Sequence, residues 1–178
     1  DVLRQELEAV LALEEDYETQ LDTARRWCKE WHFRIGVHHL RGLLDAKVAA
    51  TQYSELAEAV IQALLPRVIA QFSIKHGSPP GTGPMVIAMG SLGAGQINAQ
   101  SDLDIIVVYD PQDVETSQGR KPLATRSYYA RLTQALITAL SAPMSQGRLY
   151  EVDMRLRPSG NKGPVATSWP AFTHYQEN

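Results

Sequence analysis

The stretch GSLGAGQINAQSDLDIIVVY, residues 90–109, decides how this chain folds. Its second half opens with two aspartates and continues as an apolar run to Tyr109, a pattern that predicts a β-strand over 102–109. Side chains two residues apart leave the same face of a strand, so Asp102 and Asp104 should point together, about 6.6 Å apart along it. The glycine-rich first half follows another apolar run, 85–89, and predicts a turn into a short helix.

A third acid, Asp153, lies in the segment LYEVDMRLR, residues 149–157. Apolar and polar residues alternate there, which predicts a strand with Asp153, Arg155 and Arg157 on its polar face. If that strand lies beside 102–109, three carboxylates converge, and burying so much like charge requires a cation. Oxygen ligands without histidine or cysteine favour Mg²⁺ or Mn²⁺. The residues therefore predict a catalytic metal site for phosphate chemistry, formed by Asp102, Asp104 and Asp153.

Two simpler interpretations remain open. Asp102 follows a polar turn and could cap a turn or helix instead of binding a metal. The 149–157 strand could be a half-buried edge strand whose charges are only solvated.

The glycine turn predicts a phosphate-binding segment, because glycine lets backbone amides approach phosphate closely. Its candidate residues are Gly90, Ser91 and Gly93. The turn is not a Walker A loop, which needs Lys-Ser/Thr after its last glycine, and it lacks the full dinucleotide-binding fingerprint. Arg155 and Arg157 are candidates to bind the phosphates of the same ligand.

Composition limits the class of protein. The 178 residues carry a formal net charge of −3, which argues against a general nucleic-acid or anionic-membrane binder. A single cysteine, Cys28, excludes an internal disulfide and suits a reducing cytoplasm. We find no apolar run close to the length of a membrane span and no signal-peptide pattern. The start at Asp1 and the abrupt end suggest a piece of a larger protein.

The organisation along the chain predicts an α+β fold. Apolar stripes at helical spacing predict a helical region over 1–77, including one helix near 33–50 and a following one capped by Thr51 or Ser54. Pro66 should kink this last helix or mark a junction. The Gly- and Pro-rich run 76–84 reads as a linker. The second region, 84–178, would hold a mixed sheet with flanking helices, including one over about 123–140.

These motifs resemble the DNA polymerase β nucleotidyltransferase superfamily: an apolar strand, Gly-Ser, then Asp-x-Asp on a second strand and another acid on a third. More narrowly, the 90–104 motif and VDMRLRPSG, residues 152–160, look like glutamate–ammonia-ligase adenylyltransferase. The segment around Phe33–Gly36 and the tail 171–176 are also similar, so the likeness covers most of the chain.

The resemblance implies a polymerase β-like core over 84–178, truncated at its C-terminal end. It also implies AMP transfer from ATP to a tyrosine of glutamine synthetase by a two-metal mechanism with Mg²⁺ or Mn²⁺. Regulation of nitrogen assimilation, control by a PII-type signal protein through the full-length enzyme, and a cytoplasmic location follow from it, with no nucleic-acid or membrane partner.

The family contains an adding and a phosphorolytic removing half, and the sequence leaves the direction open. Arg157-Pro158-Ser159-Gly160 is similar to the adding half, whereas Met154 and Gly163-Pro164 look more like the removing half. Ser91 stands where the family commonly has lysine, which removes a phosphate-binding charge. A catalytically incomplete fragment that serves as a binding or regulatory module is a further alternative. A nucleotidyltransferase for another acceptor is a more distant one.

Overall fold

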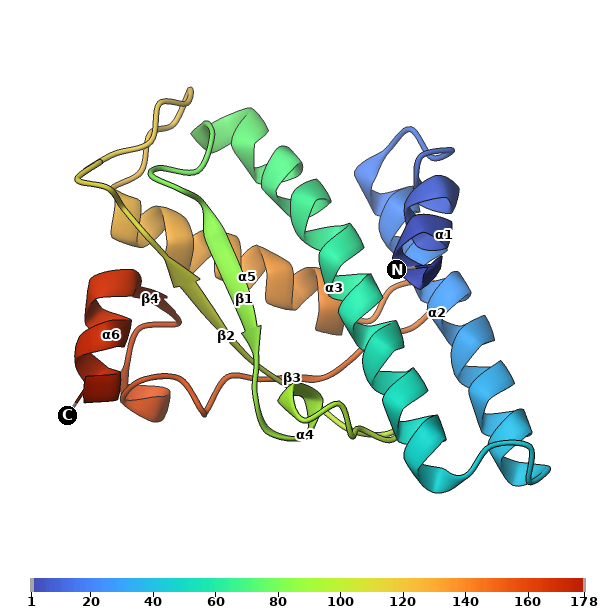
Figure 1. The fold of residues 1–178 in the computed structure, drawn as a ribbon. Coiled ribbons are helices and arrows are strands. Elements are labelled where there is room, and N and C mark those ends of the chain that lie inside the picture. The colour runs from blue at the N-terminus through green and yellow to red at the C-terminus, as the bar shows by residue number, and fades with distance from the viewer. Residues whose placement is uncertain (1, 178) are drawn as a thin grey trace.

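The structure is a computed structural model, and it describes residues 2–177. Three helices come first, and a small mixed sheet with further helices follows (Figure 1). The elements are α1 (Val2–Leu11), α2 (Tyr17–Leu40), α3 (Ala46–His76), β1 (Pro84–Ala88), α4 (Gly90–Gly93), β2 (Leu103–Tyr109), α5 (Thr125–Ser141), β3 (Val152–Asp153), the 3₁₀ turn η1 (Gly160–Lys162), β4 (Ala166–Ser168) and α6 (Trp169–Glu177). The predicted α+β fold with an N-terminal helical part is confirmed.

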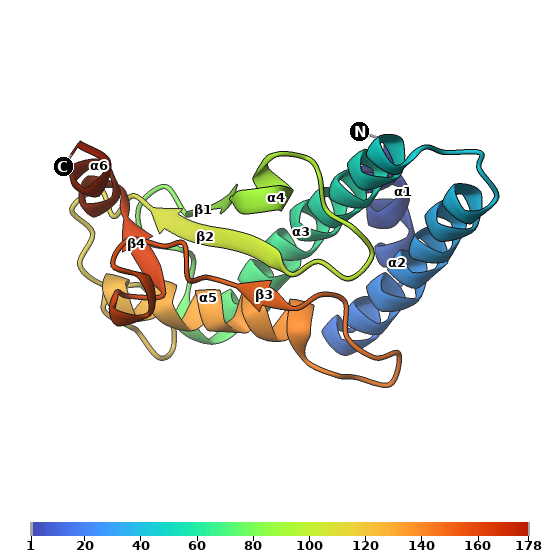
Figure 2. The ribbon, with the colours of Figure 1, turned by 90° about the horizontal axis from the view of Figure 1, so that it is seen from below.

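Strand β2 is the centre of the sheet. Strand β1 runs antiparallel to it with Pro84 opposite Tyr109 and Ala88 opposite Ile105. Strands β3 and β4 both pair with β2 in parallel, β3 at residues 103–104 and β4 at 107–109. Residues 154–165 therefore leave the sheet between two pairings with the same strand, and Figure 2 shows this excursion below β2.

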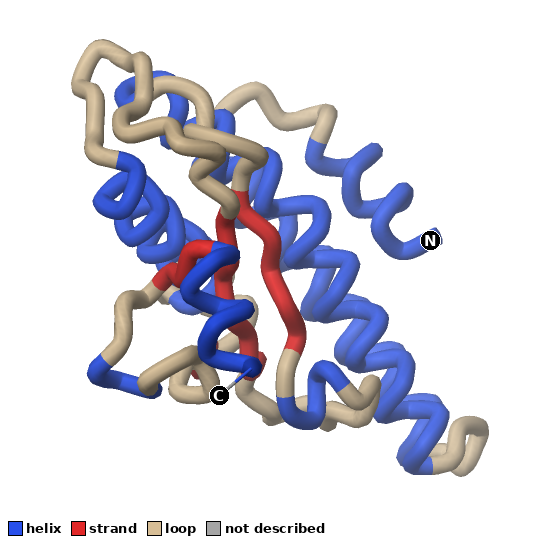
Figure 3. Tube along the Cα trace, turned by 60° about the vertical axis from the view of Figure 1, so that its left-hand side comes forward, coloured by secondary structure: helices blue, strands red, loops and turns tan. Residues whose placement is uncertain are grey.

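One core joins the helical part to the sheet. Helix α3 packs on α1, α2 and α5, and α5 also contacts β3 and β4 (Figures 1 and 3). The core cluster contains Leu64 of α3, Ile105 of β2 and Leu136 of α5, all almost fully buried. By length and composition alone α3 could cross a membrane, but core helices meet the same weak criterion. The division into regions 1–77 and 84–178 stays a prediction, because shared packing does not test it.

The predicted helix boundaries in the first third are wrong. No helix break falls at Pro66, and α3 runs through it from Ala46 to His76. The buried residues Leu64 and Val68 flank the proline, so packing on both sides offsets the hydrogen bond that proline removes. The N-cap of α3 is Asp45, whose carboxylate accepts the Val48 amide at 2.8 Å, rather than Thr51 or Ser54.

Candidate active site

The pairing of β2 and β3 brings two of the three predicted carboxylates together. In the parallel register Leu103 lies beside Val152 and Asp104 beside Asp153. Asp102 lies one residue before β2, where it is exposed, whereas Asp104 and Asp153 are half-buried. Two of the aspartates therefore lie side by side on neighbouring strands, and the third is exposed just before β2.

Gly90 lies against Asp104. Strand β1 ends at Ala88, and the Met89 amide donates to the Asp104 carbonyl at 2.8 Å, which fixes the turn against β2. Gly90 has a positive φ of 52°, and a Cβ placed there would lie 2.5 Å from Asp104 Oδ2. Only glycine permits this contact between the turn and the carboxylate. The glycine turn therefore contacts Asp104, and the assignment of both to one phosphate-binding site stays a prediction.

Helix α4 contains the other two predicted phosphate-binding residues. Ser91 is exposed on this single turn of helix. The Gly93 amide donates to the Met89 carbonyl at 2.8 Å, and a Cβ at Gly93 would lie 2.7 Å from the Ala88 carbonyl oxygen. Gly93 thus shapes the turn, whereas Ser91 faces solvent.

Arg155 holds the Asp153 carboxylate. Its backbone amide donates to Oδ1 at 2.8 Å and its Nε donates to Oδ2 at 2.7 Å. These side-chain and backbone bonds lower the pKa of Asp153, and the charge of Arg157 lowers it further. The pKa of Arg155 is raised, first by Asp153 and then by the charges of Asp104 and Asp102. Arg155 is therefore close enough to interact electrostatically with all three predicted carboxylates.

Arg157 lies in the turn that follows the Asp153–Arg155 pair. Its Nη1 donates to the Met154 carbonyl at 2.7 Å and reaches Asn161 Oδ1 at 3.5 Å. Its Nε is buried and has no hydrogen-bond partner within residues 2–177. Arg157 closes the turn that follows β3 and keeps a positive charge near Asp153.

The predicted strand over 149–157 is wrong in length, because β3 contains only Val152 and Asp153. The Asp153 side chain captures the Arg155 amide two residues ahead, and such a local bond competes with strand pairing. The Arg157 amide then donates to the Met154 carbonyl at 3.2 Å, and Pro158 has no amide to donate. The alternation predicted which face Asp153 would occupy, but the local turn ends the strand.

The donor chemistry of the site fits a hard divalent cation. Carboxylate oxygens of Asp104 and Asp153 lie on paired positions, and Asp102 adds charge at the edge. No group of three acidic, histidine or cysteine side chains is close enough to form a ready-made metal cage in the part of the chain that the structure describes. The conformation is therefore one in which Arg155, rather than a preformed cage, balances the acidic charge.

A hollow of about 720 Å³ lies on the far side of the glycine turn, between α3 and β1. Ile61, Met85 and Gly93 are among its lining residues, and none of the three aspartates is. Its walls are mainly apolar, and their charged side chains are the carboxylates of Glu55 and Glu58, which bring no positive charge to a phosphate. The carboxylate pair, not this hollow, is the candidate site.

A buried polar cluster supports the segment before β3, and the sequence did not predict it. The Tyr150 hydroxyl lies 3.4 Å from Cys28 Sγ and 3.1 Å from His32 Nε2, both on α2. Burial raises the pKa of Cys28 to about 12 and lowers that of His32. Cys28 is buried, and His32 is half-buried. No local pattern signals this cluster, because Tyr150 is more than a hundred residues away from Cys28 and His32 in the sequence.

Comparison with known proteins identifies the family. The family model of glutamate-ammonia ligase adenylyltransferase matches residues 1–178. Proteins named bifunctional glutamine synthetase adenylyltransferase/adenylyl-removing enzyme are similar to the chain. Those of Brucella suis (48% identical over 99% of this chain), Mesorhizobium japonicum (47% over 96%) and Agrobacterium fabrum (49% over 90%) are examples. The chain spans only 16–18% of the length of these relatives. The carboxylates on β2 and β3, the glycine turn against Asp104 and a match along the whole chain together place this protein in the glutamate-ammonia ligase adenylyltransferase family.

Proposed function

We propose that this chain contains the nucleotidyltransferase site that moves AMP from ATP to a tyrosine of glutamine synthetase. The observation that carries the proposal is the register of β2 and β3, which sets Asp104 beside Asp153 and against the Gly90 turn. The names of the relatives supply the acceptor. Since the chain spans less than a fifth of those proteins, its own activity and partners are part of the proposal.

Asp102, Asp104 and Asp153 are the proposed ligands of Mg²⁺ or Mn²⁺. Bound there, a pair of such ions would lower the pKa of the attacking hydroxyl and balance charge on the leaving oxygen. Asp104 is held in place by the β2 ladder and by the turn at Gly90. The rigid strand pairing lets the carboxylates keep their positions when substrate enters.

The triphosphate would lie over the glycine turn. The backbone amides of Gly90 and Ser91 and the Ser91 hydroxyl are the proposed donors to its oxygens, with Gly93 keeping the turn tight. Arg155 and Arg157 would neutralise negative charge that develops on the pyrophosphate leaving group. Arg155 suits this role because its side chain is 72% exposed.

The reverse activity is the second candidate, because the relatives' names include an adenylyl-removing function. In that case inorganic phosphate would attack the AMP–tyrosine bond at the same carboxylates. An incomplete module that binds without catalysing is the third. All three share the site and differ in what the chain does to glutamine synthetase.

Intact mass of glutamine synthetase tests these functions. The chain is incubated with unmodified synthetase, ATP and Mg²⁺, and separately with adenylylated synthetase, phosphate and Mg²⁺. A gain of one AMP per subunit in the first mixture supports the proposal, and a loss in the second supports the removing activity. No change in either mixture overturns both activities for this chain.

Asp104→Asn tests the site. The variant should reduce transfer at least about a hundredfold, since a lost carboxylate ligand weakens metal-assisted catalysis. Asp113→Asn, an exposed loop residue beyond β2, is the matched control and should keep the wild-type rate. A fully active Asp104→Asn chain with an unchanged melting curve would contradict the assigned role.

A further inference from the structure

Arg155 engages both oxygens of the Asp153 carboxylate. Its backbone amide takes Oδ1, and its guanidinium takes Oδ2 through Nε at 2.7 Å and Nη2 at 2.5 Å. The Asp153 side chain is only 13% exposed, so little of it remains open to another partner. A cation that binds Asp153 must compete with this guanidinium.

The Arg155 guanidinium is open to solvent on its other sides. The Arg155 side chain is 72% exposed and extends from the turn that follows β3. Besides Asp153, the charges of Asp104 and Asp102 act on it. Its positive charge therefore partly balances the three carboxylates, which would otherwise repel one another.

We propose that Arg155 is an internal counter-cation that occupies Asp153 until a divalent cation displaces its guanidinium, which then turns to the phosphates of the nucleotide. The inference rests on the metal-binding role proposed above for the aspartates. The reason is electrostatic: a divalent ion and a guanidinium at one carboxylate repel each other, whereas a triphosphate attracts the released arginine. The exchange couples metal entry to placement of a phosphate-binding group.

A different role for Arg155 predicts the opposite result. If the arginine only orients Asp153 for the metal, its removal should loosen the carboxylate and weaken metal binding. If it competes with the metal, its removal should strengthen binding. The sign of the change separates the two roles.

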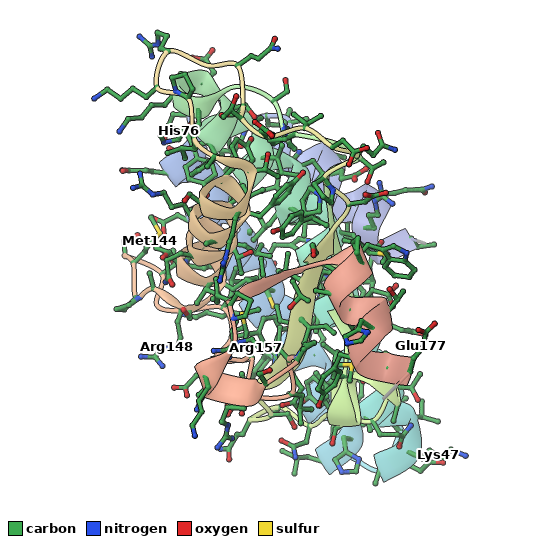
Figure 4. All side chains as sticks on the ribbon, turned by 90° about the vertical axis from the view of Figure 1, so that its left-hand side faces the viewer. Lys47, His76, Met144, Arg148, Arg157 and Glu177 are labelled. Carbon is green, nitrogen blue, oxygen red and sulfur yellow. The ribbon has the colours of Figure 1, made fainter. Side chains whose placement is uncertain are left out.

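Direct Mn²⁺ binding, measured by the electron paramagnetic resonance signal of the free ion, tests this sign on the 178-residue chain. Arg155→Met should bind Mn²⁺ about two- to fivefold tighter than wild type, the size expected for the loss of a partly exposed ion pair. Arg148→Met is the matched control. Arg148 precedes β3 and pairs with Glu151 at the surface, and it points outward at the left of Figure 4. This variant should bind as wild type does.

Equal or weaker binding by Arg155→Met, or no binding, overturns the inference. Asp104→Asn shows which hypothesis has failed. If Asp104→Asn and wild type bind Mn²⁺ equally, the proposed metal site is wrong. If Mn²⁺ binding requires Asp104 but Arg155→Met binds Mn²⁺ no tighter than wild type, only the proposed displacement of Arg155 by the metal is wrong.

A second readout follows the arginine itself. In the metal-free chain the Arg155 Nε proton, bonded to Asp153, should give a protected ¹H–¹⁵N resonance that is absent from Arg155→Met. Adding Mg²⁺ should shift this resonance and speed its exchange with water, and adding tripolyphosphate should then shift it again. A resonance that Mg²⁺ leaves unchanged while Mn²⁺ binds at Asp104 would contradict displacement.

Discussion

At the scale of single residues, the contact between Gly90 and Asp104 ties the glycine turn to the carboxylates. Two constraints require glycine at position 90. Its φ of 52° is a first demand, since it disfavours a side chain, and a second is that a Cβ would lie 2.5 Å from Asp104 Oδ2. Gly95 shares the first demand, with φ of 67°, but no atom lies within 4 Å of its Cβ position. Comparing substitutions at the two glycines therefore distinguishes the effect of backbone strain alone from the effect of a clash with Asp104.

Gly90→Ala should cost at least about 1 kcal/mol of stability and also weaken Mn²⁺ binding, because Asp104 must move away from the new methyl group. Gly95→Ala should lower the melting temperature less, because it adds backbone strain without a clash, and it should leave Mn²⁺ affinity unchanged. Thermal melts and Mn²⁺ titrations of both variants check this. Equal Mn²⁺ affinities for the two variants would show that the Gly90 contact does not position Asp104.

His32 gives the chain a pH dependence. Because burial lowers its pKa in the folded state, the unfolded chain takes up a proton first as the pH falls through the usual histidine value of about 6.5. The unfolded state then binds more protons, so the stabilising effect of neutral His32 is complete above that pH and is lost as the pH falls below it.

Melting temperatures at pH 7.5 and pH 5.5 test this effect. The drop between the two values should be smaller in His32→Gln than in wild type, since the variant has no imidazole to protonate beside Tyr150. His38→Gln, which alters an exposed residue of the same helix, should keep the wild-type drop. An identical drop in all three chains would exclude His32 as its source.

At the scale of elements, Arg25 connects α2 to the segment that leads into β3. The side chain is fully buried, and it donates to the carbonyls of Gly147 at 2.7 Å, Ala139 at 2.8 Å and Ala142 at 3.0 Å. These carbonyls belong to the end of α5 and to the turn after it. The arginine therefore fixes the path by which the chain reaches Asp153.

Arg25→Met should lower the free energy of unfolding by about 3 kcal/mol, because it leaves several buried carbonyls without their charged donor. Arg26→Met changes the neighbouring exposed arginine and should cost less than about 0.5 kcal/mol. Urea unfolding followed by circular dichroism measures both values. Similar losses in the two variants would mean that the carbonyl contacts of Arg25 contribute little.

The elements also show what the sequence could and could not predict. The continuous apolar run after Asp104 predicted β2 well, because a strand buried on both faces needs such a run. The alternation around Asp153 predicted a long strand, but a side-chain bond to the Arg155 amide ends it after two residues. Pro66 failed as a helix breaker because tertiary packing overrides local preference.

The candidate site divides in the same way. Strand patterns predicted that Asp104 and Asp153 each lie on a strand, whereas their adjacency was only a condition of the prediction and is given by the register of β2 and β3. The pairing of Arg155 with Asp153 depends on a turn of only a few residues. The support of Tyr150 by Cys28 and His32 depends on packing between distant segments, which has no local signal. These two features required the structure.

At the scale of the whole molecule, the sheet region depends on α3. Within the sheet region, the Ile97 amide donates to Ser54 Oγ at 3.1 Å, and the Tyr128 hydroxyl donates to the Gly77 carbonyl at 2.7 Å. Helix α3 also packs directly on α5 within the common core. Without α3, the sheet region would expose the apolar face of α5 that α3 now covers.

A fragment of residues 84–178 should therefore lack cooperative unfolding, whereas a fragment of residues 46–178, which keeps α3, should retain it. The physical reason is that α3 supplies the second layer of the core against α5, and a single layer cannot exclude water from its apolar face. Thermal unfolding followed by circular dichroism, together with amide proton dispersion in nuclear magnetic resonance spectra, compares the fragments with the 178-residue chain. Sharp, well-dispersed spectra and a cooperative transition for residues 84–178 alone would show that the sheet region carries its own core, and that α3 only covers it.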